Sequence, residues 1–247
     1  MKKPIKVGVI GVGYLGKFHA EKFAALEDAA LVGVADVNSH RAQEVARGLN
    51  TQAFTDYREL LPQVAAVSVA ATTTQHYAVV RDCLNQGVHV LVEKPLAVTV
   101  AEADDLVELA RRQGCFLMVG HLERFNSAME ELKRRVDRPG FIESHRLSFY
   151  KERGTDVDVV LDLMIHDLDH VLNLTASPVK EIRAAGVSVL TDRVDLANVR
   201  LEFEDGCIAN LTASRMSFKS MRKFRLFQPE TYMAVDFEAR EDRKSVV

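Results

Sequence analysis

Residues 6–17 read KVGVIGVGYLGK, a short apolar run that breaks into glycines before a helical pattern begins. The apolar run is typical of a buried parallel strand, and Gly11, Gly13 and Gly16 have the G-x-G-x-x-G spacing. Gly11 permits the tight turn, Gly13 lets the backbone approach a pyrophosphate, and Gly16 lets the following helix pack closely on its strand. Free N–H groups at the start of that helix would face the phosphate charge. The stretch therefore predicts the phosphate-binding turn of a dinucleotide site.

An acidic residue follows the next predicted strand. Residues 31–35 read LVGVA and end in Asp36, about 20 residues beyond Gly16. A carboxylate at this place accepts hydrogen bonds from the adenosine ribose hydroxyls and repels a 2′-phosphate, which favours NAD over NADP. Arg41 is close enough in sequence to leave NADP as an alternative.

The composition is that of an ordinary globular protein. At 247 residues the chain can form one large domain or two ordinary ones, and a net charge of −3 shows no basic excess for nucleic acid. The first residues are too quickly followed by a strand to be a signal peptide, and no apolar run approaches a membrane span. The three scattered cysteines lack metal-ligand spacing, which favours reduced thiols in a cytoplasm.

Polar residues follow two later strands of the same pattern. The apolar run 64–71 leads into Thr72, Thr73 and His76, and short polar side chains at a strand's carboxyl end lie where ligands bind in an open α/β sheet. A threonine here also fits as a plain N-cap of the following helix. The run 88–92 leads into Glu93-Lys94-Pro95, so Lys94 is expected to point at the cofactor crevice rather than at bulk water.

The alternation of strands and helices persists to about residue 125 and predicts a doubly wound parallel sheet, a Rossmann domain over residues 1–122. A helix at 125–136, a strand at 141–150 and a helix at 158–174 come next. Only strand-like runs follow these elements. We therefore expect a second, α+β domain over residues 123–247, with a mainly antiparallel open sheet that binds substrate and mediates oligomerisation.

The helix at 158–174 carries the strongest candidate for acid–base chemistry. Asp162, His166 and Asp169 have i, i+4 and i+7 spacing and share one face. A carboxylate one turn from an imidazole holds its tautomer and raises its basicity, as a general base for alcohol oxidation requires. Metal ligation and a solvated polar face are the alternatives. A second, apolar face is predicted from Leu161, Ile165, Leu168 and Leu172.

Other histidines and a basic cluster have weaker interpretations. His19 and His40 are interpreted as surface or packing residues, whereas His76 and His121 lie just past strand ends and suit the crevice. The basic cluster, defined as Arg215, Lys219, Arg222, Lys223 and Arg225, has two interpretations. It is either the charged face of an edge strand or a site for an anionic substrate group such as a diphosphate.

Together these residues resemble the Gfo/Idh/MocA oxidoreductases over nearly the whole chain. The residues that carry the resemblance are Gly11-Val12-Gly13-Tyr14-Leu15-Gly16, Asp36, Glu93-Lys94-Pro95, Gly120-His121, Arg124-Phe125-Asn126 and the helix from Asp162 through His166 to Asp169. One departure is Thr73, which stands where the family usually has proline.

The resemblance implies NAD(P)-dependent oxidation or reduction of a sugar or cyclitol hydroxyl, in a homodimer or homotetramer formed through the C-terminal sheet. Lys94 matches the family's catalytic lysine, often before a cis-proline, which would place a cis bond at Pro95. His166 matches the histidine acid/base and Asp162 the acid that supports it. The residues assigned to the cofactor are Gly11, Gly13, Tyr14, Leu15, Gly16, Asp36, Thr72, Thr73, His76, Glu93, Lys94 and Arg124.

Within the family the chain is most similar to bacterial members that act at C3 of UDP-N-acetylglucosamine. The stretches 120–126 and 214–229 carry that similarity. An inositol, free-sugar or dihydrodiol dehydrogenase is the alternative enzyme, with an uncharged substrate. A non-catalytic dinucleotide-binding sensor is the alternative outside catalysis. Retention of both Lys94 and His166 favours an enzyme.

Overall fold

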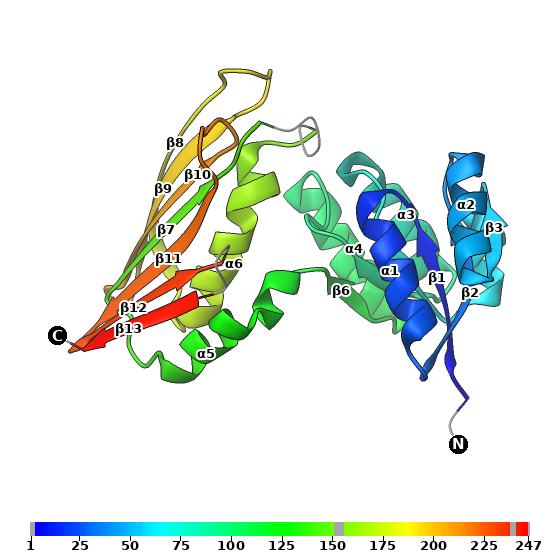
Figure 1. Ribbon diagram of the computed structural model, residues 1–247, viewed down its shortest axis with the longest axis horizontal. Coiled ribbons are helices and arrows are strands. Elements are labelled where there is room, and N and C mark those ends of the chain that lie inside the picture. The colour runs from blue at the N-terminus through cyan, green and yellow to red at the C-terminus, as the bar shows by residue number, and fades with distance from the viewer. Residues whose placement is uncertain (1–2, 151–155, 238–240, 247) are drawn as a thin grey trace. The chain divides into compact units, whose positions relative to one another are not determined.

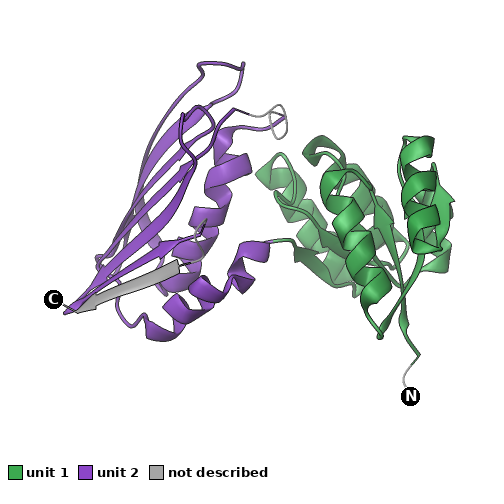
Figure 2. Cartoon of the chain, viewed as in Figure 1, with its two compact units in different colours: residues 1–120 green, residues 121–247 purple. Residues whose placement is uncertain are grey.

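The computed structural model describes residues 3–150, 156–237 and 241–246, with side chains as far as residue 237. The chain divides into two compact units, residues 1–120 and 121–247 (Figure 2). Among the described residues, no helix combines the length and the apolarity needed to cross a membrane.

The first unit is a six-stranded parallel sheet with helices between its strands, as the sequence predicts (Figure 1). Its strands are β1 (Ile5–Ile10), β2 (Ala29–Ala35), β3 (Gln52–Phe54), β4 (Ala66–Val69), β5 (His89–Val92) and β6 (Leu117–Val119). Its helices are α1 (Tyr14–Ala25), α2 (Ser39–Leu49), α3 (Thr73–Asn85) and α4 (Val100–Gln113), with short 3₁₀ turns η1 (Tyr57–Glu59) and η2 (Leu61–Gln63). The strand order β3-β2-β1-β4-β5-β6 reverses direction between β1 and β4. Ligands of open α/β sheets bind at this switch point, beyond the carboxyl ends of the strands.

Both faces of this sheet are covered by an apolar core. Neighbouring residues of a strand point to opposite faces, and Val9 and Ile10 of β1 accordingly belong to two separate clusters. Val9 packs with Ala20 of α1 and Val45 of α2, whereas Ile10 belongs with residues of α3 and α4. The doubly wound arrangement thus follows from strands that are apolar on both faces.

The second unit is a seven-stranded sheet with helices on one face (Figure 1). It begins with η3 (Leu122–Phe125), α5 (Ser127–Arg135), β7 (Phe141–Leu147), the π-helical segment η4 (Val160–Met164) and α6 (Ile165–Leu174). The strands β8 (Val179–Val187), β9 (Leu196–Phe203), β10 (Ile208–Ser214), β11 (Met221–Gln228), β12 (Thr231–Asp236) and β13 (Glu241–Val246) complete it. The order is β13-β12-β11-β7-β10-β9-β8, and only the β7–β10 pair is parallel. The mainly antiparallel sheet that the sequence predicts is confirmed.

One core holds the second unit together. Met129 and Leu132 of α5 and Val171 of α6 pack with sheet residues such as Ile142 and Leu211. Because α5 and α6 share this core, they cover the same face of the sheet (Figure 1).

The face of α6 that is buried differs from the predicted one. The segment expected as a single helix is divided into η4 and α6, and Leu172 is 54% exposed. Met164, Asp167, His170 and Val171 are buried instead. Asp167 and His170 can be buried because each has a charged partner inside the unit. A prediction from the spacing of apolar residues does not include such partners.

Candidate functional site

The glycine-rich turn between β1 and α1 leaves room for a ligand at one glycine and packs tightly at the other two. Gly11 has a φ of +81°, and a Cβ there would lie 2.8 Å from the Ala70 backbone. A Cβ on Gly16 would lie 1.8 Å from the Gly11 carbonyl oxygen, so helix and turn can approach only without a side chain. A Cβ on Gly13 would meet only the Arg41 guanidinium, at 3.9 Å. The turn is therefore closely packed at Gly11 and Gly16 and has open space at Gly13.

The start of α1 suits an anion. Gly13 is its N-cap, no side chain accepts from the cap, and the first turn carries no acidic residue. Tyr14 and Leu15 are exposed on that turn. The first N–H groups of α1 therefore keep the geometry that phosphate groups bind.

Asp36 lies at the end of β2 beside this turn. Its buried carboxylate accepts from the backbone N–H of Val12, at 3.0 Å, and of Asn38, at 2.9 Å. The Arg41 guanidinium is 3.4 Å from one carboxylate oxygen. Asp36 is thus fixed next to the glycine turn, with a cation at its side.

Lys94 lies on a turn that buried neighbours fix. The Lys94–Pro95 bond is cis, as the resemblance implies. The preceding Glu93 is buried, and its Oε1 is 3.1 Å from Nε2 of His19 on α1. Nδ1 of His19 is 2.6 Å from the Ser68 hydroxyl on β4. The sequence-based interpretation of His19 as a surface or packing residue missed this role. The position of His19 could have indicated this role, because it lies three residues after Gly16 and therefore on the same face of the helix.

Two further contacts hold the Lys94 turn. His76 is buried, with Nδ1 2.8 Å from the Pro95 carbonyl oxygen and Nε2 3.1 Å from that of Ala71. Its ring thus connects the end of β4 to the turn after β5. A Cβ on Gly120 would come within 3.2 Å of the Glu93 carboxylate, so the chain after β6 passes close to the same turn.

Thr72 and Thr73 begin α3 beside this turn. Thr72 is the N-cap residue, yet its side chain makes no capping bond to the helix, and its hydroxyl is 3.5 Å from that of Thr74. Thr72 is exposed at the carboxyl end of β4, whereas Thr73 is buried. The plain capping interpretation therefore does not account for Thr72.

His166 lies in the second unit beside a cluster of charged groups. Arg146 of β7 is buried and donates to both oxygens of Glu123, at 2.8 and 2.6 Å, and to both oxygens of Asp167, at 2.9 Å. His166 Nδ1 is 3.9 Å from one Glu123 oxygen, and His170 Nε2 is 3.5 Å from the other. Asp162 lies on η4, one turn before His166, and its N–H donates to the Asp158 carbonyl.

The electrostatics of this cluster favour ionised acids. Burial would raise the pKa of Glu123, but the nearby His170 and Arg146 hold it well below the usual range. Burial opposes the charge of Arg146, but Asp167 and Glu123 raise its pKa above the ordinary value. Glu123 and Arg146 therefore remain charged at neutral pH.

Arg124 and Asp169 also lie in the second unit. The Arg124 guanidinium donates to both Asp169 oxygens, and His121 Nδ1 is 3.9 Å from one of them. Burial would raise the pKa of Asp169, but Arg124 and His121 lower it. Arg124 was assigned to the cofactor from the sequence, and the structure shows it bound to Asp169.

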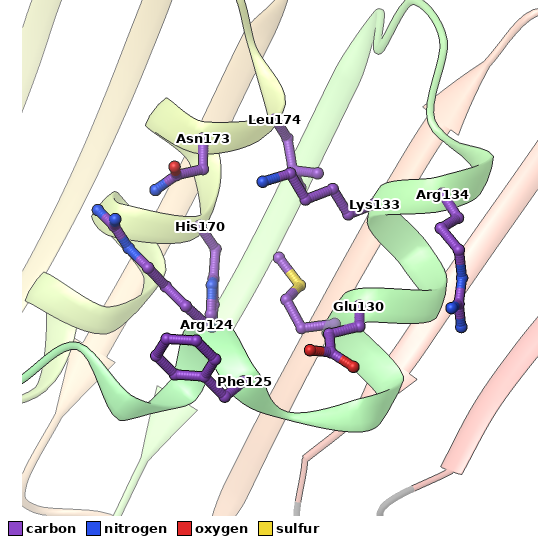
Figure 3. A pocket seen from close by; sticks show the side chains of 9 residues that line it. Arg124, Phe125, Glu130, Lys133, Arg134, His170, Asn173 and Leu174 are labelled. Carbon is purple, nitrogen blue, oxygen red and sulfur yellow. The ribbon is translucent and has the colours of Figure 1, made fainter. Parts of the chain in front are cut away.

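A hollow of about 580 Å³ opens beside Arg124 and His170 (Figure 3). Its lining comes from η3, α5 and α6 and consists of Arg124, Phe125, Met129, Glu130, Lys133, Arg134, His170, Asn173 and Leu174. Three cations line it, but Glu130 lies among them. Arg124 and Arg134 are moreover paired with Asp169 and Glu131. The charges that line this hollow therefore do not indicate a phosphate-binding site.

Known proteins resemble this chain in both units. Residues 5–121 match the model of the oxidoreductase family with an NAD-binding Rossmann fold, and residues 129–229 match that of the GFO/IDH/MocA C-terminal domain. The chain belongs to the Gfo/Idh/MocA family.

Two relatives show the range of this Gfo/Idh/MocA chain's similarity. It is 42% identical over 234 residues to UDP-N-acetylglucosamine 3-dehydrogenase of Acidithiobacillus ferrooxidans, covering 94% of this chain and 74% of that protein. A solved structure of the A. ferrooxidans enzyme matches with a TM-score of 0.92 and 39% identity, over 100% of this chain and 83% of that one. Myo-inositol 2-dehydrogenase of Thermotoga maritima is 31% identical over 85% of this chain and 69% of its own length. The chain is accordingly an NAD(P)-dependent dehydrogenase.

The residues at the switch point of this Gfo/Idh/MocA chain fit a nicotinamide dinucleotide. The open Gly13, the uncapped start of α1 and the fixed Asp36 carboxylate would hold its pyrophosphate and ribose. Among the residues whose side chains the structure describes, no group of three or more metal-ligating side chains could hold a metal ion.

The basic cluster does not form one surface. Arg215 is buried, where it donates to the Val157 carbonyl and lies 3.8 Å from Asp195. Arg225 pairs with Glu143 of β7, at 3.0 Å. Lys223 and Arg225 lie on the opposite face of β11 from Phe224 and Leu226, which are buried. The interpretation as a diphosphate site therefore loses its geometric basis.

Proposed function

We propose that the chain oxidises a nucleotide sugar, UDP-N-acetylglucosamine, at its C3 hydroxyl with NAD. The observation that carries the proposal is the identity of 42% to the A. ferrooxidans UDP-N-acetylglucosamine 3-dehydrogenase, set against 31% to the inositol enzyme. The same reaction would need a lysine and a histidine at the family's catalytic positions. This chain has Lys94 in a turn held by buried neighbours and His166 beside charged groups.

Lys94 and His166 serve the same reaction in this proposal. His166 takes the proton of the substrate hydroxyl as a general base. The Lys94 ammonium stabilises the negative charge that develops on that oxygen, an electrostatic role of the oxyanion-hole kind. Asp162, one turn before His166, orients the proton-transfer group. The bound nicotinamide supplies the hydride acceptor.

The cofactor in this proposal is NAD, because Asp36 holds a carboxylate where the ribose hydroxyls would lie. Arg41 is the residue that offers NADP a partner for its 2′-phosphate.

Replacing Asp36 by Asn tests this preference. Asn has one acceptor oxygen and so keeps only one of the two bonds from the N–H groups of Val12 and Asn38. The charge that favours ribose hydroxyls and repels a 2′-phosphate is lost. We expect the ratio of the NADP Kd to the NAD Kd to fall about tenfold, as one charged hydrogen bond becomes neutral. Titration calorimetry with both dinucleotides measures it, with Asp104→Asn on the exposed surface of α4 as the control. An unchanged ratio would remove Asp36 from cofactor selection.

The assembly in this proposal is a homodimer or homotetramer in the cytoplasm. The support is the second sheet, whose helices share the core on one face only. Its other face presents side chains such as Leu196 and Phe227, which are exposed in the single chain.

A substrate panel tests the proposed function. Purified protein with NAD is followed at the reduced-nicotinamide absorbance band in the presence of UDP-N-acetylglucosamine, free N-acetylglucosamine or myo-inositol. A signal with the UDP-sugar alone supports the proposal. A signal with inositol or the free sugar would instead favour the alternative dehydrogenase, and silence with NAD bound would favour the sensor.

A further inference from the structure

The Glu123 carboxylate lies at the centre of a network that includes the candidate base. It comes from η3, whereas Arg146 comes from β7 and the two histidines from α6. Each Glu123 oxygen accepts one Arg146 N–H and faces one imidazole. Oε1 is 3.9 Å from His166 Nδ1, and Oε2 is 3.5 Å from His170 Nε2.

The carboxylate cannot easily turn away from these imidazoles. Arg146 is 3% exposed and holds both Glu123 oxygens, while Asp167 fixes the far side of the same guanidinium. His170 is 1% exposed, with its ring stacked on Phe237 at a centroid distance of 5.3 Å. Glu123 is therefore held by partners that are themselves immobilised by packing.

The charged side chain that approaches His166 is an acid. Glu123 on η3 faces His166 directly. The other charged and titratable groups of this network are Arg146 on β7 and Asp167 and His170 on α6, while Asp162 lies on η4 and Asp169 on α6 contacts Arg124 and His121. Glu123 and Asp167 carry two negative charges against the single positive charge of Arg146. The excess negative charge nearest to an imidazole nitrogen is that of Glu123.

We propose that Glu123 is a positioning residue for His166, which orients the imidazole through Nδ1 and stabilises its protonated form. The separation of 3.9 Å is longer than a hydrogen bond, and catalytic contacts commonly tighten when substrate binds. Nε2 of His166 is then the nitrogen that takes the hydroxyl proton. This inference rests on the proposed function for the role of His166, but the charge effect on the imidazole does not depend on it.

Replacing Glu123 by Gln keeps the shape and an acceptor for Arg146 but removes the charge. Oxidation needs the unprotonated imidazole, so its rate rises with pH as His166 loses its proton. Without the nearby negative charge the protonated form is less stable. We therefore expect the acidic limb of the kcat profile to move to lower pH by roughly one unit. KM should stay within about twofold, because in this proposal Glu123 acts through His166 and not on the substrate.

Nuclear magnetic resonance of the imidazole gives a second measurement that needs neither substrate nor cofactor. The His166 signal is assigned by its loss in His166→Gln. In the wild-type protein its titration midpoint is expected above that of a histidine in a short peptide, about 6.5. In E123Q it should fall by about one unit. Glu131→Gln, which removes a partly exposed acid on α5 that pairs with Arg134 and Arg135, is the matched control. It should change neither the titration midpoint nor the acidic limb.

The outcomes separate this inference from the proposed function. A wild-type His166 midpoint at or below the peptide value would overturn the inference, even if E123Q does not fold. An E123Q midpoint equal to that of the wild type would overturn it as well. If the substrate panel is silent but the midpoint falls in E123Q, the charge effect of Glu123 on the imidazole stands and the proposed function fails.

Discussion

Replacing Lys94 by Met is expected to lower kcat by at least about a thousandfold while NAD still binds. Methionine has nearly the length of lysine but no charge, so the alkoxide that develops on the substrate loses its stabilising ammonium. The glycine turn, Asp36 and the start of α1, which hold the dinucleotide in the proposal, are unchanged. NAD binding is measured by titration calorimetry and turnover by the nicotinamide absorbance.

Lys180→Met is the matched control for this variant, because Lys180 is exposed on β8 in the other unit. Its turnover should equal that of the wild type. A Lys94→Met protein that retains more than a tenth of the wild-type kcat would rule out the ammonium as a catalytic group.

Replacing Arg146 by Met is expected to lower the free energy of unfolding by about 3–5 kcal/mol at pH 7. The guanidinium holds Glu123 and Asp167 together, and its loss leaves two acids inside the unit without their cation. Denaturant unfolding measures the change. Arg183→Met, which breaks an exposed pair with Glu181 on β8, is the control and should change stability little.

The stability difference between wild type and R146M should narrow as pH is lowered from about 7 towards 4. In the wild type the folded-state pKa of Glu123 lies below its ordinary value, so its contribution is complete above that ordinary value and is lost only as pH falls towards the folded-state pKa. The narrowing between pH 7 and 4 therefore arises in R146M. In R146M the buried acids lack their cation and gain stability when they take up protons. A difference that widens at low pH would show that Glu123 and Asp167 are not held by Arg146.

The first unit was predictable because its signals are local. Gly11, Gly13 and Gly16 fix the turn, and the apolar runs before Thr72 and Glu93 fix the strands that lead to the crevice. Each of these features depends on neighbours within one strand–turn–helix unit. The resemblance added the cis bond before Pro95 and the family, which the structure and the comparisons confirm.

The charged interior of the second unit was not predictable, because its partners lie far apart in sequence. From the sequence alone, Asp167 and His170 look like solvated residues on a helix. In the structure Asp167 binds Arg146, which lies more than 20 residues earlier on β7, and His170 contacts Glu123. Glu123 looks like one acid in a polar stretch for the same reason. For the basic cluster, the sequence suggested exposed charges, but Arg215 is buried and donates to the Val157 carbonyl. That partner is distant in sequence, so the local pattern does not reveal it.

The central claim, hydride transfer from C3 of a UDP-sugar, is tested most directly by isotope transfer. UDP-N-acetylglucosamine carrying deuterium only at C3 is incubated with the protein and NAD. The mass of the reduced dinucleotide is then measured by mass spectrometry. We expect one deuterium in the reduced nicotinamide of the wild-type reaction, and at least about a thousandfold less reduced nicotinamide in the same time from Lys94→Met. Reduced nicotinamide without deuterium in the wild-type reaction would contradict the claim, because the hydride would then come from another carbon.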